Sequence, residues 1–388
     1  MGENSPSART ILDWYDHNRR ILPWREDPTP YHVWLSEIML QQTRVEAVRG
    51  YYERFLRELP DIPSLAAAEE DRCLKLWEGL GYYSRIRNMR KAAGQIMEEY
   101  GGAMPSEPSE LVKLPGIGRY TAAAIASIAF GKKAAAVDGN LLRIFARLTA
   151  YAENSRTDGC KNAAEQYFLS LMDAEETVTD NACTVSDASE APSKSVSASQ
   201  KNVFGSFNQA LMDLGATVCL PNTQPACDRC PWQDDCLAHK CGQETDFPVT
   251  KPKKARRIEN RTVLVIHDED RTVLHKRTDQ GLLAGLYELP NTEGHLDEKG
   301  ALQYVRSLGF EPLRIRALGE AKHIFSHIEW HMIGYAVKTD ELQLEDRNIL
   351  SRQASGPADE FLLVRSREAR EHYAIPSAFS FYNPFMMR

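Results

Sequence analysis

The spacing of apolar residues changes once along this chain of 388 residues, and the change limits the possible folds more than any other feature. Between residues 8 and 150, apolar residues recur at the helical period of about 3.6. From residue 261 onward the period falls toward 2, the period of a strand, and the polar turn 268–270 separates two strand-like segments. The pattern predicts a multidomain protein in which an all-α region precedes an α+β domain.

The individual segments can also be predicted. Helices are expected in the first region at 11–20, 33–41, 45–59, 74–80, 86–100, 121–130 and 141–148. Another helix is expected at 203–214, and the last third is expected to contain a helix at 302–308 and strands at 261–267, 272–277 and 328–338.

Two stretches separate the periodic segments. Residues 177–200 are rich in Ser, Ala, Thr and Asp with almost no large apolar residue, so we expect a mobile insertion there. Residues 237–260 include the basic run KPKKARR and are expected to form an extended linker. The predicted domains are therefore an all-α region, 1–236, and a C-terminal domain, 261–388.

The composition excludes several classes of protein. A hydrophobic content of 43% fills ordinary cores, and a mean hydropathy of -0.45 is typical of a soluble protein. The longest mostly apolar stretch, 122–130, is far shorter than the roughly 20 residues of a spanning helix, and the first residues lack the apolar core of a signal peptide. We expect an intracellular protein with no membrane partner, cytoplasmic and nucleoid-associated if it is bacterial.

The net charge of -7 leaves nucleic-acid binding to local basic surfaces. Basic residues gather in three groups: Arg19, Arg20 and Arg25; Arg44 and Arg49; Arg85, Arg87, Arg90 and Lys91. Tyr82 and Tyr83 precede the last group, where an aromatic side chain could wedge between bases. A solvated helix face with a core tyrosine is the alternative.

Five of the eight cysteines fall within 23 residues, which indicates metal binding in a chain without an export signal. Cys219, Cys227, Cys230 and Cys236 are separated by seven, two and five residues. Four thiolates suit zinc or a [4Fe-4S] cluster, and the cluster is favoured because only one pair has the short spacing typical of structural zinc sites. Cys241 leaves open a second ligand set that begins at Cys227.

Gly116 and Gly118 lie in LPGIG, between two predicted helices. A tight hairpin there would present their backbone N–H groups at a helix N-terminus, which is a phosphate site that reads no bases. A plain helix–turn connection is the alternative, because two glycines alone prove little.

Two carboxylates stand out. Glu37 lies in the apolar segment HVWLSEIMLQQT, either on the wet face of a helix or in a cleft where desolvation raises its pKa toward that of a general acid. Asp138 directly precedes a predicted helix and is first of all an N-cap, which would also hold it in one rotamer and stabilise its ionised form. Two carboxyl groups in unlike surroundings are what the cleavage of a glycosidic bond requires.

Several segments together resemble one family, and they span nearly the whole chain outside 177–200. The segments are SEIMLQQTRVE, GLGYYSRIRN, LPGIGRYTAAAI, VDGNLLRIFARL, FNQALMDLGATVC, GLLAGLYELP and HIFSHIEW. In their order and their residues they resemble the A/G-specific adenine DNA glycosylases (MutY family) of the endonuclease III-like superfamily.

The resemblance implies a helix-hairpin-helix DNA glycosylase joined to a Nudix-like domain that recognises 8-oxoguanine. Its six-helix core would occupy about 30–138, with the hairpin motif at 109–130, and residues 7–29 and 139–236 would form the [4Fe-4S] region. The implied activity is base excision repair: the enzyme flips adenine opposite 8-oxoguanine or guanine out of double-stranded DNA and hydrolyses its N-glycosidic bond. We expect it to act as a monomer.

The resemblance also implies roles for individual residues. Glu37 would protonate N7 of adenine, and Asp138 would stabilise or attack the sugar cation. Tyr120 and Asn140 would assist. The residues expected to contact DNA are Gln42, Thr43, Tyr82, Gly116 and Gly118. The loop expected to recognise 8-oxoguanine comprises Phe325, Ser326 and His327.

The sequence departs from its relatives in informative places. Bifunctional relatives carry lysine where this chain has Tyr120, and a phenol cannot form a Schiff base, so we predict a monofunctional enzyme. The first cysteine gap has seven residues where the family typically has six, which keeps both ligand sets open. The C-terminal third shows no glutamate-rich Nudix box, so we expect this domain to bind without hydrolysing.

Two other functions are compatible with parts of the sequence. The first is a glycosylase for another mispaired base, such as uracil or thymine. The second is a non-catalytic binder of damaged DNA, against which the presence of both carboxylates argues.

Overall fold

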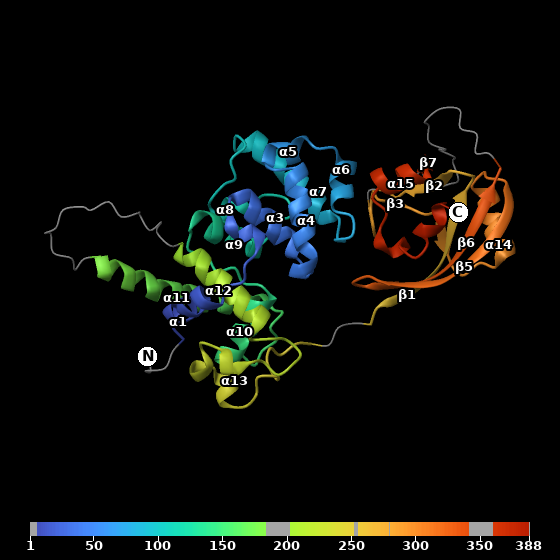
Figure 1. Cartoon of the computed structure of the whole chain (residues 1–388). Helices are drawn as coiled ribbons and strands as arrows, with labels where there is room; N and C mark the ends of the chain where they lie inside the picture. Colours follow the sequence, from blue (N-terminus) through green and yellow to red (C-terminus); the bar gives the residue numbers. More distant parts are fainter. Residues whose placement is uncertain (1–5, 184–201, 252–254, 279, 341–359, 388) are drawn as a thin grey trace. The chain divides into compact units, whose positions relative to one another are not determined.

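The computed structural model describes residues 6–183, 202–251, 255–278, 280–340 and 360–387 (Figure 1). By its internal contacts the chain forms two compact units, one combining the residues up to 63 with 91–252 and the other combining 64–90 with 253–388. The predicted division assigned 64–90 to the all-α region because of its place in the chain. The greater part of the predicted insertion, 184–200, lies outside the described residues.

The first unit is built from helices, as the periodicity predicts. Its helices are α1 (Ala8–Asn18), α2 (Pro23–Glu26), α3 (Pro30–Leu40), α4 (Val45–Glu58), α8 (Pro108–Leu111), α9 (Arg119–Phe130), α10 (Gly139–Thr149), α11 (Asp158–Cys183), α12 (Val203–Thr217) and α13 (Leu237–Lys240). Around the boundary with the second unit lie α5 (Ile62–Ala67), α6 (Glu70–Leu76) and α7 (Ser84–Glu99). The predicted helices of the first region are confirmed, except that the one predicted at 74–80 overlaps α6 only at 74–76. The pattern missed α2, α5 and α11, and α13 occupies the start of the predicted linker.

Helix α12 lies unusually close to α9, and the sequence explains how. Asn202 caps α12 by accepting from the N–H of Gly205 (2.8 Å), while its amide donates to the carbonyls of Ser127 (2.7 Å) and Ile128 (2.9 Å) near the end of α9. A Cβ atom at Gly205 would lie 2.8 Å from the Ser127 carbonyl oxygen. Glycine is therefore needed for this approach, which places the inner face of α12 beside the site described below.

The second unit contains a seven-stranded mixed sheet. Its strands are β1 (Arg257–His267), β2 (Arg271–Lys276), β3 (Tyr287–Glu288), β4 (Asn291–Glu293), β5 (Pro312–Ile324), β6 (Ile328–Thr339) and β7 (Glu360–Arg365), and its helices include α14 (Glu298–Ser307) and α15 (Ser366–His372). The main order is β3-β2-β1-β6-β5, with β4 on β1 and β7 on β2. Strands β1 and β6 pair in parallel, and the other pairs are antiparallel. The predicted hairpin, the strand at 328–338 and the helix at 302–308 are confirmed, whereas β3, β4, β5, β7 and α15 were not predicted.

The central strand β1 buries side chains on both faces of the sheet. Val263 and Val265 belong to one apolar cluster together with Trp330, and Leu264 and Ile266 belong to another beneath α14. A strand covered on both faces is continuously apolar rather than alternating. This explains why its period-2 signal is weak in the run TVLVI.

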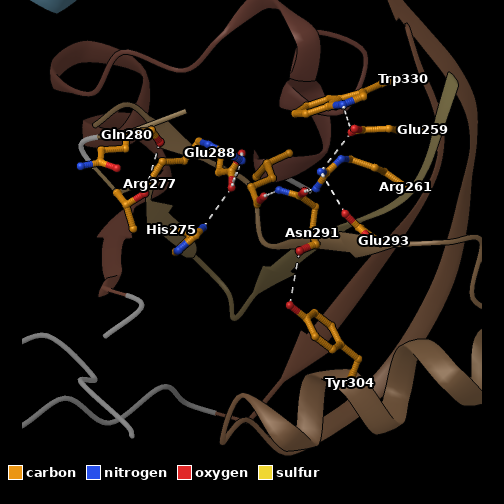
Figure 2. A network of polar contacts seen from close by, with 12 residues as sticks. Glu259, Arg261, His275, Arg277, Gln280, Glu288, Asn291, Glu293, Tyr304 and Trp330 are labelled. Atoms are coloured by element: carbon orange, nitrogen blue, oxygen red, sulfur yellow. Dashed lines mark hydrogen bonds and ion pairs between the residues drawn. The ribbon is translucent and has the colours of Figure 1, made fainter. Parts of the chain in front are cut away.

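A polar network ties this sheet to α14 (Figure 2). Trp330 donates its Nε1–H to Glu259 (2.9 Å), and the guanidinium of Arg261 lies 4.5 Å from the Trp330 ring centroid. Arg261 also donates to the side chain of Asn291 (2.9 Å), and Tyr304 of α14 donates to the Asn291 carbonyl (3.3 Å). The network satisfies charges that would otherwise be costly at the end of a buried sheet.

The buried carboxylate of Glu288 is the centre of a second group of polar contacts, with Arg277 and His275 (Figure 2). Arg277 donates to both of its oxygens at 2.9 Å, and His275 lies 3.0 Å from one of them. Both bonds come from Nη1, so one charged nitrogen is shared between the two carboxylate oxygens. This pairing fastens β3 to β2 and to the turn that follows β2.

The segment 64–90 is held to the rest of the second unit by hydrogen bonds from α6 and the loop after it. Glu78 accepts from the backbone N–H of Ile375 (2.9 Å), and Lys75 donates to the Tyr373 carbonyl (3.1 Å). Asp71 accepts from the hydroxyl of Tyr287 (3.0 Å).

Across the described ranges, no helix has both the length and the apolar character needed to cross a bilayer.

Candidate functional site

Glu37 lies on the inner face of α3, where it is buried with only 6% of its surface exposed. The hydroxyl of Tyr120, at the start of α9, donates to its Oε2 at 2.6 Å. Burial raises the pKa of Glu37 to about 7; the Tyr120 hydrogen bond and the charge of Arg25 oppose the rise, and Asp138 adds to it. The cleft interpretation of this residue is therefore correct, and the wet-face alternative is wrong.

Asp138 is the N-cap of α10, as predicted. Its Oδ1 accepts from the backbone N–H groups of Asn140 and Leu141, both at 2.8 Å, and its Oδ2 accepts from the side-chain amide of Asn140 (2.9 Å). Burial raises the pKa of Asp138, while these hydrogen bonds act against the rise by stabilising the ionised form. Arg143 holds Asn140 in turn, donating to its Oδ1 (3.0 Å) and to the Cys219 carbonyl (2.8 Å).

The two carboxylates line one pocket of about 240 Å³. Tyr120, Asn140 and Thr43 line it as well, so the four residues predicted to be catalytic come together there with one of those predicted to bind DNA. Its apolar wall includes Leu22, Trp24, Val33, Leu40 and Val45. A mostly apolar pocket with two carboxylates, a phenol and an amide is suited to a flat base attached to a sugar that develops positive charge.

Sequence reasoning missed the opposite wall of this pocket. Arg20 and Arg25 line it, and both bind the fully buried carboxylate of Asp213 on α12. Sequence reasoning placed both arginines in a basic surface group, whereas the Arg25 side chain is only 13% exposed. The segment FNQALMDLGATVC contains Asp213 at a position that helical periodicity would place on the buried face, and a buried Asp was the available signal.

The hairpin between α8 and α9 has the geometry expected from its glycines. Gly116 adopts φ of +79°, which favours glycine, and Gly118 is the N-cap of α9. Both are exposed, and a Cβ atom at Gly118 would meet nothing within 4 Å. The backbone at the start of α9 is therefore open to an anion such as a phosphate.

Gln42 and Tyr82 share an unusual backbone conformation. Their φ angles are +60° and +48°, in the left-handed region that non-glycine residues rarely adopt. Both are exposed, with 48% of the Tyr82 surface accessible. Strained exposed residues of this kind concentrate at ligand-binding loops.

The third basic group is only partly available to a ligand. Arg85 is buried and donates to the carbonyls of Leu80 and Gly81, each at 3.0 Å, so it shapes the loop that carries Tyr82. Arg87 pairs with Glu70 at 2.8 Å. The prediction that these arginines form one basic surface is wrong for Arg85, because its charge is used inside the protein.

Within the second unit, the predicted recognition loop connects β5 to β6. Phe325 packs against Trp330, with ring centroids 4.9 Å apart, whereas Ser326 and His327 are exposed. The Ser326 hydroxyl lies 2.9 Å from that of Tyr82, and all four of the residues Tyr82, Phe325, Ser326 and His327 line a pocket of about 470 Å³. Phe325 thus anchors the loop and leaves the next two side chains to face a ligand.

Four cysteines converge after α12. Cys219, Cys227, Cys230 and Cys236 line one pocket, whereas Cys241 is exposed and is absent from its lining. Burial raises the pKa of the Cys227 thiol to about 11 and that of Cys230 to about 12. The extra residue of the first gap is absorbed in an exposed loop, where Asn222 has φ of +58° and the Ala226 N–H returns to the Val218 carbonyl (3.0 Å).

Two parts of the chain match known families, and whole proteins match most of it. Residues 35–168 match the HhH-GPD superfamily base excision DNA repair protein, and residues 261–381 match the NUDIX domain. The adenine DNA glycosylase of Rattus norvegicus is 33% identical over 379 residues, which cover 83% of this chain and 68% of the rat protein. Proteins of the same name from two subspecies of Buchnera aphidicola are similar too. The one from Buchnera aphidicola subsp. Baizongia pistaciae is 32% identical, covering 82% of each chain. The one from Buchnera aphidicola subsp. Schizaphis graminum is 33% identical, covering 84% of this chain and 86% of its own.

Proposed function

Since the chain belongs to the adenine DNA glycosylase family, we propose that it removes adenine opposite 8-oxoguanine or guanine from double-stranded DNA by hydrolysing the N-glycosidic bond. The observation that carries this proposal is the shared pocket of Glu37 and Asp138. One of these carboxyl groups is buried with a pKa of about 7, and the other is fixed by three hydrogen bonds at a helix start. The first group is suited to donating a proton to the leaving base, and the second is suited to stabilising the positive charge that develops on the sugar.

Glu37 supplies the proton in the proposed reaction. Its Oε2 already accepts from Tyr120, so the acid proton is expected on Oε1. Transfer of that proton to N7 of adenine allows the electron pair of the C1′–N9 bond to leave with a neutral base. Water then attacks C1′, and the Glu37 carboxylate accepts a proton from that water, which restores the acid.

Asp138 stabilises the sugar as positive charge develops on it. The N–H donors of α10 hold its carboxylate in one orientation, and Asn140 fixes the second oxygen. A fixed anion in a pocket of low polarity is effective because it need not reorganise when the charge forms. Its hydrogen bonds favour the ionised form and so oppose the effect of burial, which raises its pKa.

Tyr120 supports a monofunctional reaction. Its hydroxyl is committed to Glu37, and a phenol oxygen cannot form an imine with the sugar. The cations that line the pocket, within the part of the chain that the structure describes, are the arginines Arg20, Arg25 and Arg44, and no lysine is among them. No Schiff base is therefore expected, and strand cleavage should depend on a later step.

The remaining predicted residues are proposed to hold the DNA. The hairpin amides of Gly116 and Gly118 would bind a phosphate, while Gln42 and Tyr82 would enter the base stack on the strand that carries 8-oxoguanine. Thr43, which follows Gln42 in the sequence and lines the pocket of Glu37 and Asp138, would contact the DNA beside the flipped adenine. Ser326 and His327, held out by Phe325, would hydrogen-bond the N7–H or O8 that distinguish 8-oxoguanine from guanine, a contact of about 1 to 3 kcal/mol.

Single-turnover release from a duplex with adenine opposite 8-oxoguanine tests this function. We expect free adenine and an intact strand, which breaks only after alkali treatment, because no imine intermediate forms. Duplexes with uracil or thymine opposite guanine serve as controls for another base and are expected to stay intact. Breaks before alkali would contradict the monofunctional proposal, and release of uracil or thymine instead of adenine would contradict the substrate.

The four half-buried cysteines Cys219, Cys227, Cys230 and Cys236 are proposed to hold a [4Fe-4S] cluster. Zinc bound by four thiolates would draw the sulfur atoms to about 4 Å from one another. Among the described residues, the donor atoms that lie within 4.8 Å of one another as a group belong to Cys227, His239 and Glu244. That group includes one of the four cysteines, whereas all four line the same pocket, and this shared pocket is the observation that supports a cluster. Bound there, a cluster would cross-link the segment after α12 with the loops that precede α13.

The side chain of Arg147 is placed to offset the negative charge of four thiolates. Its Nη1 donates to Cys219 Sγ (3.2 Å) and to the Leu220 carbonyl (3.0 Å), and only 3% of the residue is exposed. A buried cation of this kind stabilises thiolates whose protons must leave when iron binds.

Substitution of single cysteines distinguishes the two ligand sets. Cys230→Ser is expected to abolish most of the broad absorbance near about 400 nm that iron–sulfur proteins show, because serine is a poor ligand for this group. Cys241→Ser is the matched control and is expected to retain the band and the iron content, since Cys241 is exposed outside the pocket. Loss of the band in Cys241→Ser together with its retention in Cys219→Ser would favour the second set.

A further inference from the structure

Asp213 occupies a place in the pocket wall that the proposed reaction does not explain. Its side chain is fully buried on α12, yet it carries a carboxylate. It accepts four hydrogen bonds: from the Arg20 N–H (3.0 Å) and Nε (2.7 Å), and from Arg25 Nη1 (2.8 Å) and Nη2 (2.9 Å). The pair with Arg25 is a two-pronged fork, which fixes the plane of the guanidinium as well as its position.

Arg25 connects the Asp213 carboxylate to the proposed acid, Glu37. It lines the same pocket as Glu37, and its charge acts directly on Glu37. The other groups that act on Glu37 are Tyr120 from α9 and Asp138 from the start of α10. Around Arg25 and Asp213 lie Tyr15, Arg19 and Arg20. The Arg25 guanidinium is 5.7 Å from the Tyr15 ring centroid.

Stability alone is a poor explanation for this arrangement. Replacing a buried ion cluster by apolar side chains of similar volume is often neutral or stabilising, because desolvation cancels much of the attraction. An arginine without a partner would sample many rotamers beside the pocket, whereas the fork and the second arginine leave it one position. The cluster is therefore better explained by the position it gives to the Arg25 guanidinium than by a contribution to the free energy of folding.

We propose that Asp213 is a positioning residue that holds the Arg25 guanidinium at the pocket wall, where its positive charge stabilises the carboxylate that Glu37 becomes after giving up its proton. This inference rests on the proposed role of Glu37 as the acid. Asp213 itself touches neither base nor sugar in this scheme. It acts through Arg25, and its removal should therefore change the behaviour of Glu37 only when Arg25 is present.

The test is the pH dependence of adenine release in wild type, Asp213→Asn, Arg25→Gln and the double variant. Below enzyme saturation the profile reports groups of the free enzyme, and the rate falls as pH rises through the pKa of the acid, near 7 in the wild type. Loss of Arg25 destabilises ionised Glu37, so the midpoint should rise by about 0.5 to 1 pH unit. Asp213→Asn should raise it as Arg25→Gln does, and the double variant should show no more than Arg25→Gln alone.

A matched control comes from the second unit, where Asp268 forms a comparable clamp with Arg271. Asp268 accepts from Arg271 N–H (2.9 Å) and Nε (2.8 Å), and its side chain is 5% exposed. Asp268→Asn is expected to leave the midpoint unchanged even if it lowers the melting temperature. Arg25→Lys, which keeps the charge, should return the midpoint at least halfway to that of the wild type.

Several outcomes would overturn the proposal. An unchanged midpoint in Asp213→Asn, a downward shift, or equal shifts with and without Arg25 would each show that Asp213 does not act by holding Arg25. If Asp213→Asn melts below the assay temperature, Asp213→Glu replaces it, because the longer side chain keeps its charge but displaces the fork; the same upward shift is expected. A wild type that releases no adenine would refute the proposed function instead, and the two failures are thus distinguishable.

Discussion

Glu37→Gln is expected to lower the single-turnover rate of adenine release by at least about 100-fold while DNA binding persists. Glutamine has nearly the same shape, and its carbonyl can still accept the Tyr120 hydrogen bond that holds Glu37 (2.6 Å). It cannot donate an acidic proton to N7, however, so adenine would have to leave as an anion. The substitution therefore removes the chemical step and leaves the pocket intact.

The half-buried Tyr151 and the exposed Glu153 provide a matched control for this experiment. The Tyr151 hydroxyl donates to Glu153 at 3.1 Å, so Glu153→Gln makes the same chemical change beside a tyrosine outside the pocket. Its rate is expected to stay within about twofold of the wild type. Binding would be measured with a duplex whose adenosine carries a 2′-fluoro group and resists hydrolysis. Full adenine release by Glu37→Gln would remove Glu37 as the acid of the mechanism, whereas a wild type that binds the duplex and releases no adenine would favour the non-catalytic binder.

Asp138→Asn is expected to reduce the same rate by about 10² to 10³-fold with little loss of stability. Asn is as good an N-cap as Asp, so α10 should begin at the same residue and the melting temperature should change little. What disappears is the negative charge beside the sugar. The expected defect is therefore in catalysis, because the substitution removes the negative charge of the side chain and keeps its function as a helix N-cap.

Asp297 allows the cap to be tested without the chemistry. It caps α14 through a 2.7 Å hydrogen bond from the Gly300 N–H, and it lies in the second unit. Asp297→Asn is expected to leave both the melting temperature and adenine release near wild-type values. If Asp138→Asn instead lowered the melting temperature sharply, its slower reaction would be a folding defect and the proposed charge stabilisation would lose its support.

Much of the fold could be predicted because its local signals agree with its packing. The helices of the first region could be predicted from the amphipathic period of their apolar residues. Asp138 could be predicted as a helix N-cap from its position before a helical segment, and it is the N-cap of α10. Strand β5 was missed because its burial alternates weakly and it ends in a polar, exposed stretch. The grouping of 64–90 with the second unit could not be predicted, since it depends on contacts such as Glu78 with Ile375 across almost 300 positions of sequence.

The candidate site was predictable for a different reason: its residues lie in segments whose chemistry is unusual. A glutamate in an apolar helix and an aspartate before a helix attract attention by themselves. Arg25 and Asp213 do not, because each alone resembles an ordinary surface charge, and only the fold brings them within 2.9 Å. Arg85 shows the same limit, since nothing local indicates that its guanidinium serves two backbone carbonyls.

The loop between Cys219 and Cys227 bears on how relatives of this chain are found. Its tip, 221–224, projects into solvent, and the bond between Ala226 and Val218 closes its base. Residues can therefore be added or removed at the tip without displacing either sulfur. A search pattern that demands one fixed distance between these two cysteines would discard proteins whose binding pocket is unaltered, so motif definitions for this region should tolerate variable length there.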